Sequence, residues 1–320
     1  MKTILINPSK SVVKRKKESL AVSLSIDFKK NWQLYVMLLP LVLFYLLFHY
    51  KPMYGVIIAF KDYSARLGIM GSEWVGFRYF IDFFTGPYFM RTFWNTFFIS
   101  MCTLIFSFPM PIFLALLINE LRSRTYSRMV QTVSYLPHFI SLVVICSLIK
   151  EFTASKGIIT TVLSVFCFPK VSMLNEPGLF VPVYVISDIW QSMGWGSIVY
   201  LAALTSINQE LYEAARIDGA GRLRQILSIS LPSIMPTIII MLILRLGGLM
   251  SVGYEKIILL YNPATYSTSD VISSFVFRRG IIERNYSFST AVGLFNSVIN
   301  CILLFGSNKL SKQLSESSLW

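Results

Sequence analysis

The chain has 320 residues, of which 54% are hydrophobic, 15% aromatic and 14% charged, and its mean hydropathy is +0.61. This composition is typical of an integral membrane protein and excludes an ordinary soluble domain. The net charge of +13 could indicate a nucleic-acid partner, but its densest run, Lys14 to Lys17, lies in an N-terminal tail just ahead of the first apolar segment. A basic flank on the cytosolic face of a membrane explains that run better, so we predict no nucleic-acid partner.

Six segments are apolar and long enough to cross a membrane, since a spanning helix needs about 20 mainly apolar residues. They are residues 33–50, 92–118, 133–150, 179–206, 232–250 and 289–307. The predicted fold class is therefore all-α integral membrane, with a basic cytosolic tail at residues 1–31 and a six-helix domain at residues 32–320. No small-residue cleavage site follows the first segment, which we predict to be retained. The apolar stretch 158–167 is too short to span and is expected on the membrane surface or re-entering.

Lysine and arginine set the expected orientation of these helices. With the N-terminus in the cytosol, the segments placed inside are richer in lysine and arginine than those placed outside. This bias agrees with the positive-inside rule. Because six spans return the chain to its starting side, both termini are predicted to be cytosolic.

The segment between the fourth and fifth predicted spans, residues 208–231, is polar and should lie in the cytosol. Asn208 is predicted to cap a short helix, which Gly219 and Gly221 end because glycine enters the left-handed region without strain. A second short helix then leads to Pro232. One face of the first helix carries Leu211, Ala214, Ala215 and Asp218. Small side chains there would let another protein approach closely, although a hairpin that merely joins two spans would look similar.

The same segment carries a family signature. Its residues match the pattern E-A-A-x(3)-G-x(9)-I-x-L-P at Glu213, Ala214, Ala215, Gly219, Ile229, Leu231 and Pro232. This pattern resembles that of the permease subunits of bacterial ABC importers, and "LYEAARIDGAG" resembles their maltose-permease-like carbohydrate branch. Further segments, such as "GVIIAFKDYS", "QTVSYLPHFIS" and "YNPATYSTSDVI", resemble permeases for polysaccharide-derived, often uronate-containing oligosaccharides.

The resemblance implies a function, partners and coupling residues. Residues 208–231 would be the coupling helices that dock in a cleft of a cytosolic ATPase, with Glu213, Ala214, Ala215, Asp218 and Gly219 as coupling residues. The implied partners are a second homologous permease, two ATPase subunits, an extracellular sugar-binding lipoprotein, an oligosaccharide and membrane lipid. ATP and Mg²⁺ would be bound by the ATPase, because this chain has no P-loop motif and needs no cofactor of its own. Transport would proceed by alternating access in a bacterial cell membrane.

Polar side chains inside the predicted spans could line a path for such a solute. The substrate-path residues predicted are Asp188, Gln191, Trp195, Arg245 and Asn296. Asp188 and Arg245 are charges deep within spans, where each costs about 2.5–3.5 kcal/mol unless it finds a partner or water. We predict that these two pair, or that Arg245 instead faces an anionic sugar. The alternative for the polar residues is hydrogen bonding between helices, at about 0.6 kcal/mol each.

The outer segment 250–288 mixes aromatic and basic side chains. It contains Tyr254, Tyr261, Tyr266, Tyr286, Arg278, Arg279 and Arg284. Aromatic rings and arginines suit acidic sugars, but they also suit the docking of a binding protein or an interfacial aromatic belt. We favour docking or the belt.

Two other classes of function are tested by what the sequence lacks. An ion-coupled secondary transporter, or a channel-like protein acting without an ATPase, is the alternative, but no internal repeat is visible and Asp188 is the one acidic residue deep in a span. A membrane enzyme would need a catalytic set, yet His49 and His138 form no HExxH motif and the cysteines form no CxxC pair. We predict no catalytic residues, no metal site and no enzyme activity.

Overall fold

The computed structural model describes residues 29–315, so the predicted N-terminal tail lies, up to residue 28, outside the described residues. The chain divides into two compact units, residues 1–55 and 56–320. In the described part of the first unit, α2 (Trp32–Tyr45) continues through a π-helical turn, η1 (Leu46–Tyr50), into α3 (Lys51–Met53). The chain stays helical through the 3₁₀ segment η2 (Tyr54–Phe60).

The second unit continues with a short hairpin and a surface helix. These elements are β1 (Lys61–Asp62), α4 (Gly68–Gly71), β2 (Glu73–Trp74) and α5 (Arg78–Thr85). The two strands pair antiparallel, with Lys61 opposite Trp74. Tyr79 donates a hydrogen bond of 2.7 Å to Asp62, and burial together with this carboxylate raises the pKa of Tyr79 to about 12. The Tyr79 hydroxyl therefore remains a donor at neutral pH.

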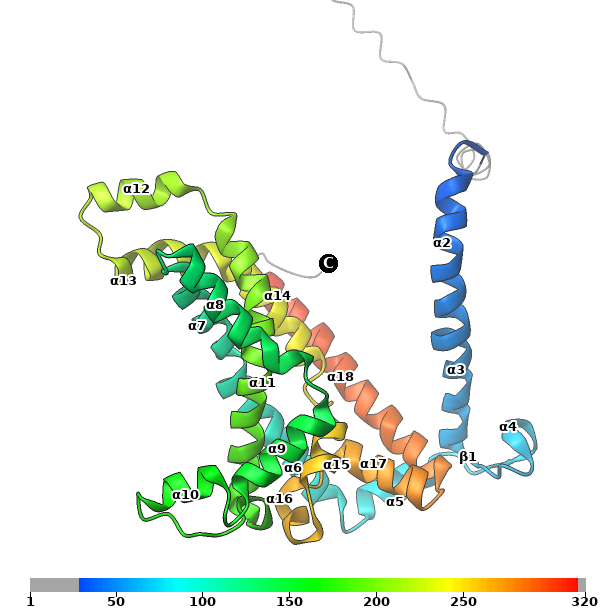
Figure 1. The fold of residues 1–320 in the computed structure, drawn as a ribbon. Helices are drawn as coiled ribbons and strands as arrows, with labels where there is room; N and C mark the ends of the chain where they lie inside the picture. Colours follow the sequence, from blue (N-terminus) through cyan, green and yellow to red (C-terminus); the bar gives the residue numbers. More distant parts are fainter. Residues whose placement is uncertain (1–28, 316–320) are drawn as a thin grey trace, which may run out of the picture. The chain divides into compact units, whose positions relative to one another are not determined.

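Helices make up the rest of the second unit (Figure 1). In chain order they are α6 (Phe89–Cys102), η3 (Thr103–Ser107), α7 (Pro109–Asn119), α8 (Arg124–Tyr135), η4 (Leu136–Phe139), α9 (Leu142–Thr153), α10 (Ile158–Ser164), η5 (Met173–Asn175) and α11 (Pro177–Thr205). They continue as α12 (Gln209–Ile217), α13 (Arg222–Gln225), η6 (Ile226–Ser230), α14 (Leu231–Gly247), α15 (Tyr254–Leu260), η7 (Pro263–Thr265), α16 (Tyr266–Ser269), α17 (Ile272–Phe277), η8 (Arg278–Ile282) and α18 (Tyr286–Ser315).

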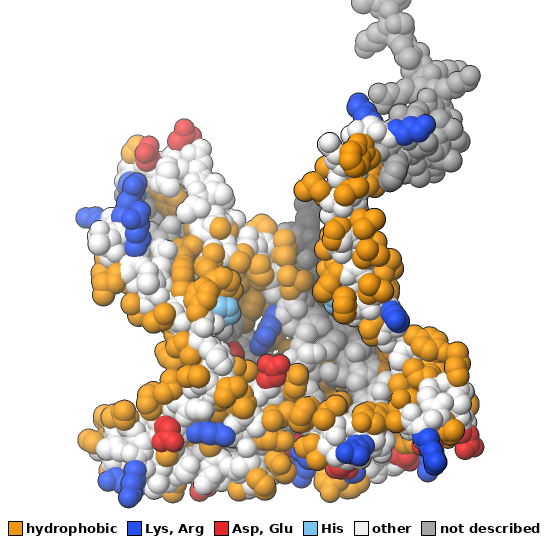
Figure 2. Space-filling view, turned by 45° about the vertical axis from the view of Figure 1, so that its right-hand side comes forward, with side chains coloured by type: hydrophobic (Ala, Val, Ile, Leu, Met, Phe, Trp, Pro, Cys, Tyr) orange, Lys and Arg blue, Asp and Glu red, His pale blue; other side chains and the backbone are white. Residues whose placement is uncertain are grey.

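Four helical segments within residues 29–315 are long and apolar enough to cross a membrane. They are Trp32–Phe60, Phe89–Asn119, Arg222–Gly247 and Tyr286–Gln313. A bent pair, Arg124–Phe139 and Leu142–Ser164, makes a fifth if it is counted as one span. The all-α membrane class is confirmed, and Figure 2 shows hydrophobic side chains dominating the middle of the second unit while charged ones gather toward its two ends.

The third predicted span, residues 133–150, is not one straight helix. The chain bends by 99° between η4 and α9, because Ile140 and Ser141 both leave the helical conformation, each with a ψ of 137°. Pro137, which lacks an amide hydrogen, lies in the 3₁₀ turn just before the bend. Downstream, α10 covers only Ile158–Ser164 and is too short to cross a membrane.

The fourth predicted span forms the centre of the second unit. Helix α11 has 29 residues, which corresponds to a length of about 43 Å. It packs against α7, α8, α14 and α16, and Figure 1 shows it running from the α12–α13 hairpin at one end to the α10 and α16 region at the other. Because α11 carries several polar residues, it is less apolar than the four spans named above. Length alone would let α11 cross a bilayer.

The crossing of α8 and α11 depends on a glycine. A Cβ atom at Gly194 would overlap the carbonyl carbon and oxygen of Ser134, so the two backbones are in direct contact there. At Gly178, on the same helix, the equivalent Cβ would meet no atom within 4 Å. Only the first position therefore requires glycine for packing.

We predict that Gly194→Ala lowers the stability of the protein by about 1–3 kcal/mol, because the added methyl group must push α8 away from α11. The melting temperature of the purified protein in detergent measures this effect. Gly178→Ala is the matched control and should melt like the wild type. Equal melting temperatures for the two variants would contradict the close approach.

Candidate functional site

Residues 208–231 form a helical hairpin as predicted from the sequence. The Asn208 side chain accepts a 3.0 Å hydrogen bond from the amide of Glu210 at the start of α12. The helix ends at Ile217, and Gly219 follows with a φ of +76°, a conformation that favours glycine. The predicted cap and the predicted glycine break are both confirmed.

One side of the hairpin is anchored and the other is free. Tyr212 is buried in a cluster with Leu204 and Ile234, and its hydroxyl lies 2.9 Å from Ser230 Oγ. The coupling residues predicted by the resemblance point elsewhere. Glu213, Ala214, Asp218 and Gly219 are exposed, and Ala215 is half-buried. The hairpin therefore presents this side for contact while Tyr212 holds it to the helices behind.

The hairpin continues without a break into a long helix, which corrects one prediction. The sequence suggested a separate short helix ending before Pro232, where the next span would begin. Instead, one helical segment runs from Arg222 to Gly247 through the π-helical turn η6. A π turn just ahead of Pro232 fits a helix in which a proline cannot donate its backbone hydrogen bond.

A charged cavity of about 310 Å³ lies near the other end of this helix. It lies among α6, η3, α11, α14 and α15, and the residues lining it include Ser100, Thr103, Asp188, Gln191, Arg245 and Lys256. Three of the five predicted path residues, Asp188, Gln191 and Arg245, therefore face one space. Lys256 is an additional charge that the sequence did not single out.

The predicted ion pair between Asp188 and Arg245 is wrong. Asp188 instead lies 4.0 Å from Lys256 Nζ and accepts a 2.5 Å hydrogen bond from Ser107. Lys256 comes from α15, because the chain folds back after α14 and packs α15 against α9. Sequence spacing gave no sign of this return, since Lys256 lies outside every predicted span.

Arg245 and Lys256 are both incompletely paired. Within residues 29–315, Arg245 makes no hydrogen bond or ion pair, although it lines the same cavity as Asp188. The Lys256 side chain is 6% exposed and lies over the Tyr184 ring at 5.0 Å, but its Nζ has no hydrogen-bond partner within the described part of the chain. The cavity thus holds two cations and one carboxylate.

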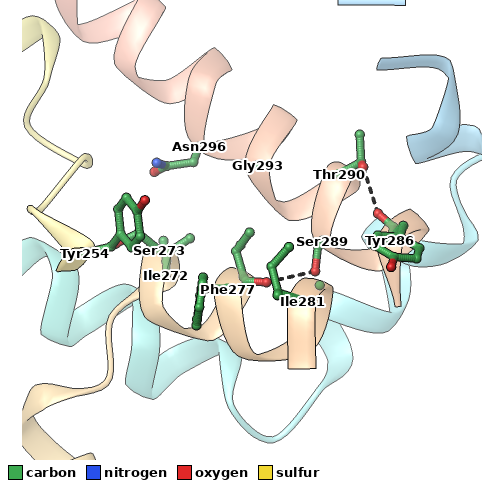
Figure 3. Close-up of a pocket in the computed structure, with 12 residues that line it drawn as sticks. Tyr254, Ile272, Ser273, Phe277, Ile281, Tyr286, Ser289, Thr290, Gly293 and Asn296 are labelled. Carbon is green, nitrogen blue, oxygen red and sulfur yellow. Dashed lines mark hydrogen bonds between the residues drawn. The ribbon is translucent and has the colours of Figure 1, made fainter. Parts of the chain in front are cut away.

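The other two predicted path residues lie elsewhere. Trp195 stacks on His138, with ring centroids 4.6 Å apart and an interplanar angle of 5°. Asn296 lines a second cavity of about 460 Å³ formed by α15, α17, η8 and α18, together with Tyr254 and Phe277 (Figure 3). The Asn296 Oδ1 atom is buried and has no hydrogen-bond partner in residues 29–315. The five residues therefore do not form one site.

Two arginines of the outer segment 250–288 form ion pairs with carboxylates of the same segment. Asp270 is fully buried and pairs with Arg278 at 2.7 Å and with Arg91 at 3.4 Å. Burial alone would lower the pKa of Arg278, but the hydrogen bond and charge of Asp270 outweigh burial and raise it. Arg279 pairs with Glu283 at 2.5 Å. These contacts tie the segment to α6 and to itself.

Comparison with known proteins identifies the chain. Residues 107–313 match the protein family described as binding-protein-dependent transport system inner membrane component. The chain belongs to this family. It is therefore a multi-pass membrane permease subunit, from a family of transport components and not of enzymes. The resemblance that the sequence analysis drew from its motifs is confirmed.

Similar proteins extend over almost the whole permease. "Protein LplB" of Bacillus subtilis (strain 168) is 44% identical over 300 residues, covering 93% of this chain and 94% of that protein. The polygalacturonan/rhamnogalacturonan transport system permease protein YteP of the same organism is 41% identical over 288 residues, covering 90% of each. A chain from the crystal structure of a bacterial ABC transporter involved in the import of the acidic polysaccharide alginate matches with a TM-score of 0.84 and 44% identity. This match covers 92% of this permease and 99% of that chain.

We predict that Asp270→Asn destabilises the permease by about 3–5 kcal/mol, because it removes the charge that pairs with Arg91 and Arg278. Glu283→Gln is the matched control, since it removes the carboxylate of an exposed pair and should cost no more than about 1 kcal/mol. Thermal unfolding of both purified variants measures the difference. Similar losses in the two variants would show that the Asp270 network contributes no more than a surface ion pair.

Proposed function

We propose that this permease belongs to an ATP-driven importer of uronate-containing oligosaccharides and works by alternating access. One observation carries the proposal. The second arm of the hairpin and Arg245, which lines the charged cavity, lie along one continuous helical segment, Arg222–Gly247. Arg222 and Arg245 are 23 residues apart, a distance of about 35 Å along the helix axis. A displacement of the second arm of the hairpin, from Arg222 onward, is therefore carried to the cavity through a continuous helix, and Tyr212 and the turn at residues 218–221 join α12 to that arm.

In this proposal, a partner ATPase causes the displacement of the hairpin. ATP and Mg²⁺ are bound by two ATPase subunits, which contact Glu213, Ala214, Ala215, Asp218 and Gly219 of this chain. Closure of the ATPases moves the hairpin, and the cavity opens outward; hydrolysis returns it inward. A second, homologous permease completes the pore. The small side chains of Ala214, which is exposed, and Ala215, which is half-buried, support this role, because they allow another protein to approach α12 closely.

The topology proposed has six spans, with residues 208–231 and both termini in the cytosol. It adds α11 and the bent α8–α10 segment to the four apolar helices. Figure 1 supports opposite faces for the two functional regions, since the α12–α13 hairpin and the α16 region lie at opposite ends of the second unit. The outer end would receive an extracellular sugar-binding lipoprotein. One similar solved structure is an alginate transporter in complex with a periplasmic protein that holds an alginate pentasaccharide.

The charges of the cavity support an acidic substrate. Arg245 and Lys256 supply two positive charges against the single negative charge of Asp188, and Arg245 is free to bind a carboxylate in a bidentate manner. Gln191 adds an amide suited to sugar hydroxyls. Asn296, whose Oδ1 atom has no hydrogen-bond partner in the described part of the chain and which shares its cavity with Tyr254, is proposed as a neighbouring contact. Trp195 stays a prediction from the sequence.

We predict that Gly219→Pro and Glu213→Ala reduce retention of the ATPase when it is co-purified with the two permeases. Proline requires a φ near −65°, which is incompatible with the φ of +76° at Gly219, and Glu213→Ala removes an exposed charge. Gly221→Ala is the matched control, because Gly221 has a φ of −65° and open space around its Cβ position. Retention of the ATPase by all three variants would leave residues 208–231 as a plain connecting hairpin.

The function itself is tested by reconstitution of both permeases, the ATPase and the binding protein in lipid vesicles. We expect uptake of oligogalacturonate or oligoalginate that requires ATP and the binding protein. Uptake that continues without the ATPase would instead support an ion-coupled or channel-like transporter. Uptake of neutral oligosaccharides alone would retain the importer and reject the acidic substrate.

A further inference from the structure

We propose that Lys256 is a specificity residue that binds a carboxylate of the substrate. While the cavity is empty, the carboxylate of Asp188 pairs with Lys256 in place of the substrate carboxylate. The inference rests on the proposed import of acidic oligosaccharides and adds the residue that selects the charge. Binding then exchanges one carboxylate for another at the same ammonium group. The observations that carry it are the looseness of the ion pair, the second partner of Asp188 and the charge balance of the cavity.

The ion pair between Asp188 and Lys256 is loose. The two charged groups are 4.0 Å apart, a separation too long for a hydrogen bond, and Lys256 Nζ has no hydrogen-bond partner within residues 29–315. A buried ammonium group with three donors normally satisfies them, because an unpaired buried charge is costly. Lys256 therefore has donors available for a further oxygen at the cavity wall.

Asp188 has a second partner that lets it leave Lys256. Its Oδ2 atom accepts the 2.5 Å hydrogen bond from Ser107, while the lysine approaches Oδ1. The Asp188 side chain is 26% exposed, so water from the cavity can reach it. When a substrate carboxylate takes Lys256, Asp188 keeps the Ser107 hydrogen bond and gains solvent. The exchange therefore strands no buried charge.

The charge balance favours an anionic ligand over a neutral one. In the empty cavity, Asp188 offsets one of the two cations and leaves a net charge of +1. A bound carboxylate brings the sum to zero and accepts hydrogen bonds from both Arg245 and Lys256. A neutral sugar leaves Arg245 without a counter-charge and cannot displace Asp188. Discrimination thus comes from a cation that a neutral ligand leaves unpaired.

The experiment measures uptake by the complete reconstituted transporter. Two substrates are compared: the oligouronate that the wild type transports, and its carboxyl-reduced, neutral counterpart of equal length. Lys256→Met should raise the half-saturating concentration of the oligouronate by about tenfold or more, because a charged hydrogen-bonding partner is lost. Asp188→Asn should lower it, because the competing carboxylate is gone. Neither change should be seen with the neutral substrate.

Two further variants protect the test against misfolding. Ser107→Ala changes no charge, and it should raise the half-saturating concentration of the oligouronate, because Asp188 loses its second partner and holds Lys256 more strongly. The double variant Asp188→Asn/Lys256→Met removes both charges of the pair, so neither is left buried without its partner and the transporter should assemble. It should nevertheless lose the preference for the acidic substrate. Lys150→Met, at an exposed lysine of α9 outside the cavity, is the matched control and should behave like the wild type.

The opposite signs of the two single substitutions decide the inference. A structural ion pair would make Asp188→Asn and Lys256→Met impair transport in the same direction and for both substrates, and this result would overturn the exchange. Equal effects of Ser107→Ala on acidic and neutral uptake would overturn it as well. A wild type that imports no oligouronate would instead reject the proposed function, so the two failures are distinguishable.

Discussion

The cost of holding a charge away from water governs how the second unit of this permease is built. Each deeply placed charge on which the fold relies is matched by a partner from a distant part of the chain. Asp188 on α11 meets Lys256 on α15, and Asp270 meets Arg91 from α6, 179 residues earlier. The Asp270 contacts hold the segment after α15 against α6, whereas the looser Asp188–Lys256 contact, at 4.0 Å, places α15 beside the cavity. Apolar packing alone would not specify those positions, because lipid is as apolar as the side chains.

The same constraint joins structure to transport. A cavity that binds an acidic sugar, as proposed for this permease, needs cations, yet cations in an empty cavity are unfavourable. The permease reconciles these demands by keeping one carboxylate, Asp188, within reach of Lys256 and by leaving Arg245 open to the cavity. The long helix that begins at Arg222 connects the second arm of the hairpin directly to Arg245. In the proposed mechanism, the second arm of the hairpin and the cavity residue Arg245 thus belong to the two ends of one helix.

Sequence patterns predicted the local structure and the family well. Runs of apolar residues located the helices, and Asn208 and Gly219 set the ends of α12 as expected, because capping and left-handed backbone depend on nearby residues only. The bend between α8 and α9 and the role of Lys256 were missed. Apolarity alone does not reveal a 99° turn, and the burial of Lys256 depends on distant packing, because a lysine outside the spans carries no sign that α15 will bury it.

The π-helical turn η6 has a geometric effect on the long helix. It lies at Ile226–Ser230, between the hairpin and Arg245. A π turn contains one residue more than an α turn, and each α-helical residue rotates the chain by about 100°. The wider turn accommodates the extra residue, so the face of the hairpin and the side chain of Arg245 keep the relative angle of an uninterrupted α-helix. A one-residue deletion within η6 would restore an ordinary α-helical turn and keep the two ends in phase, whereas the same deletion elsewhere in the helix would rotate one end by about 100° relative to the other.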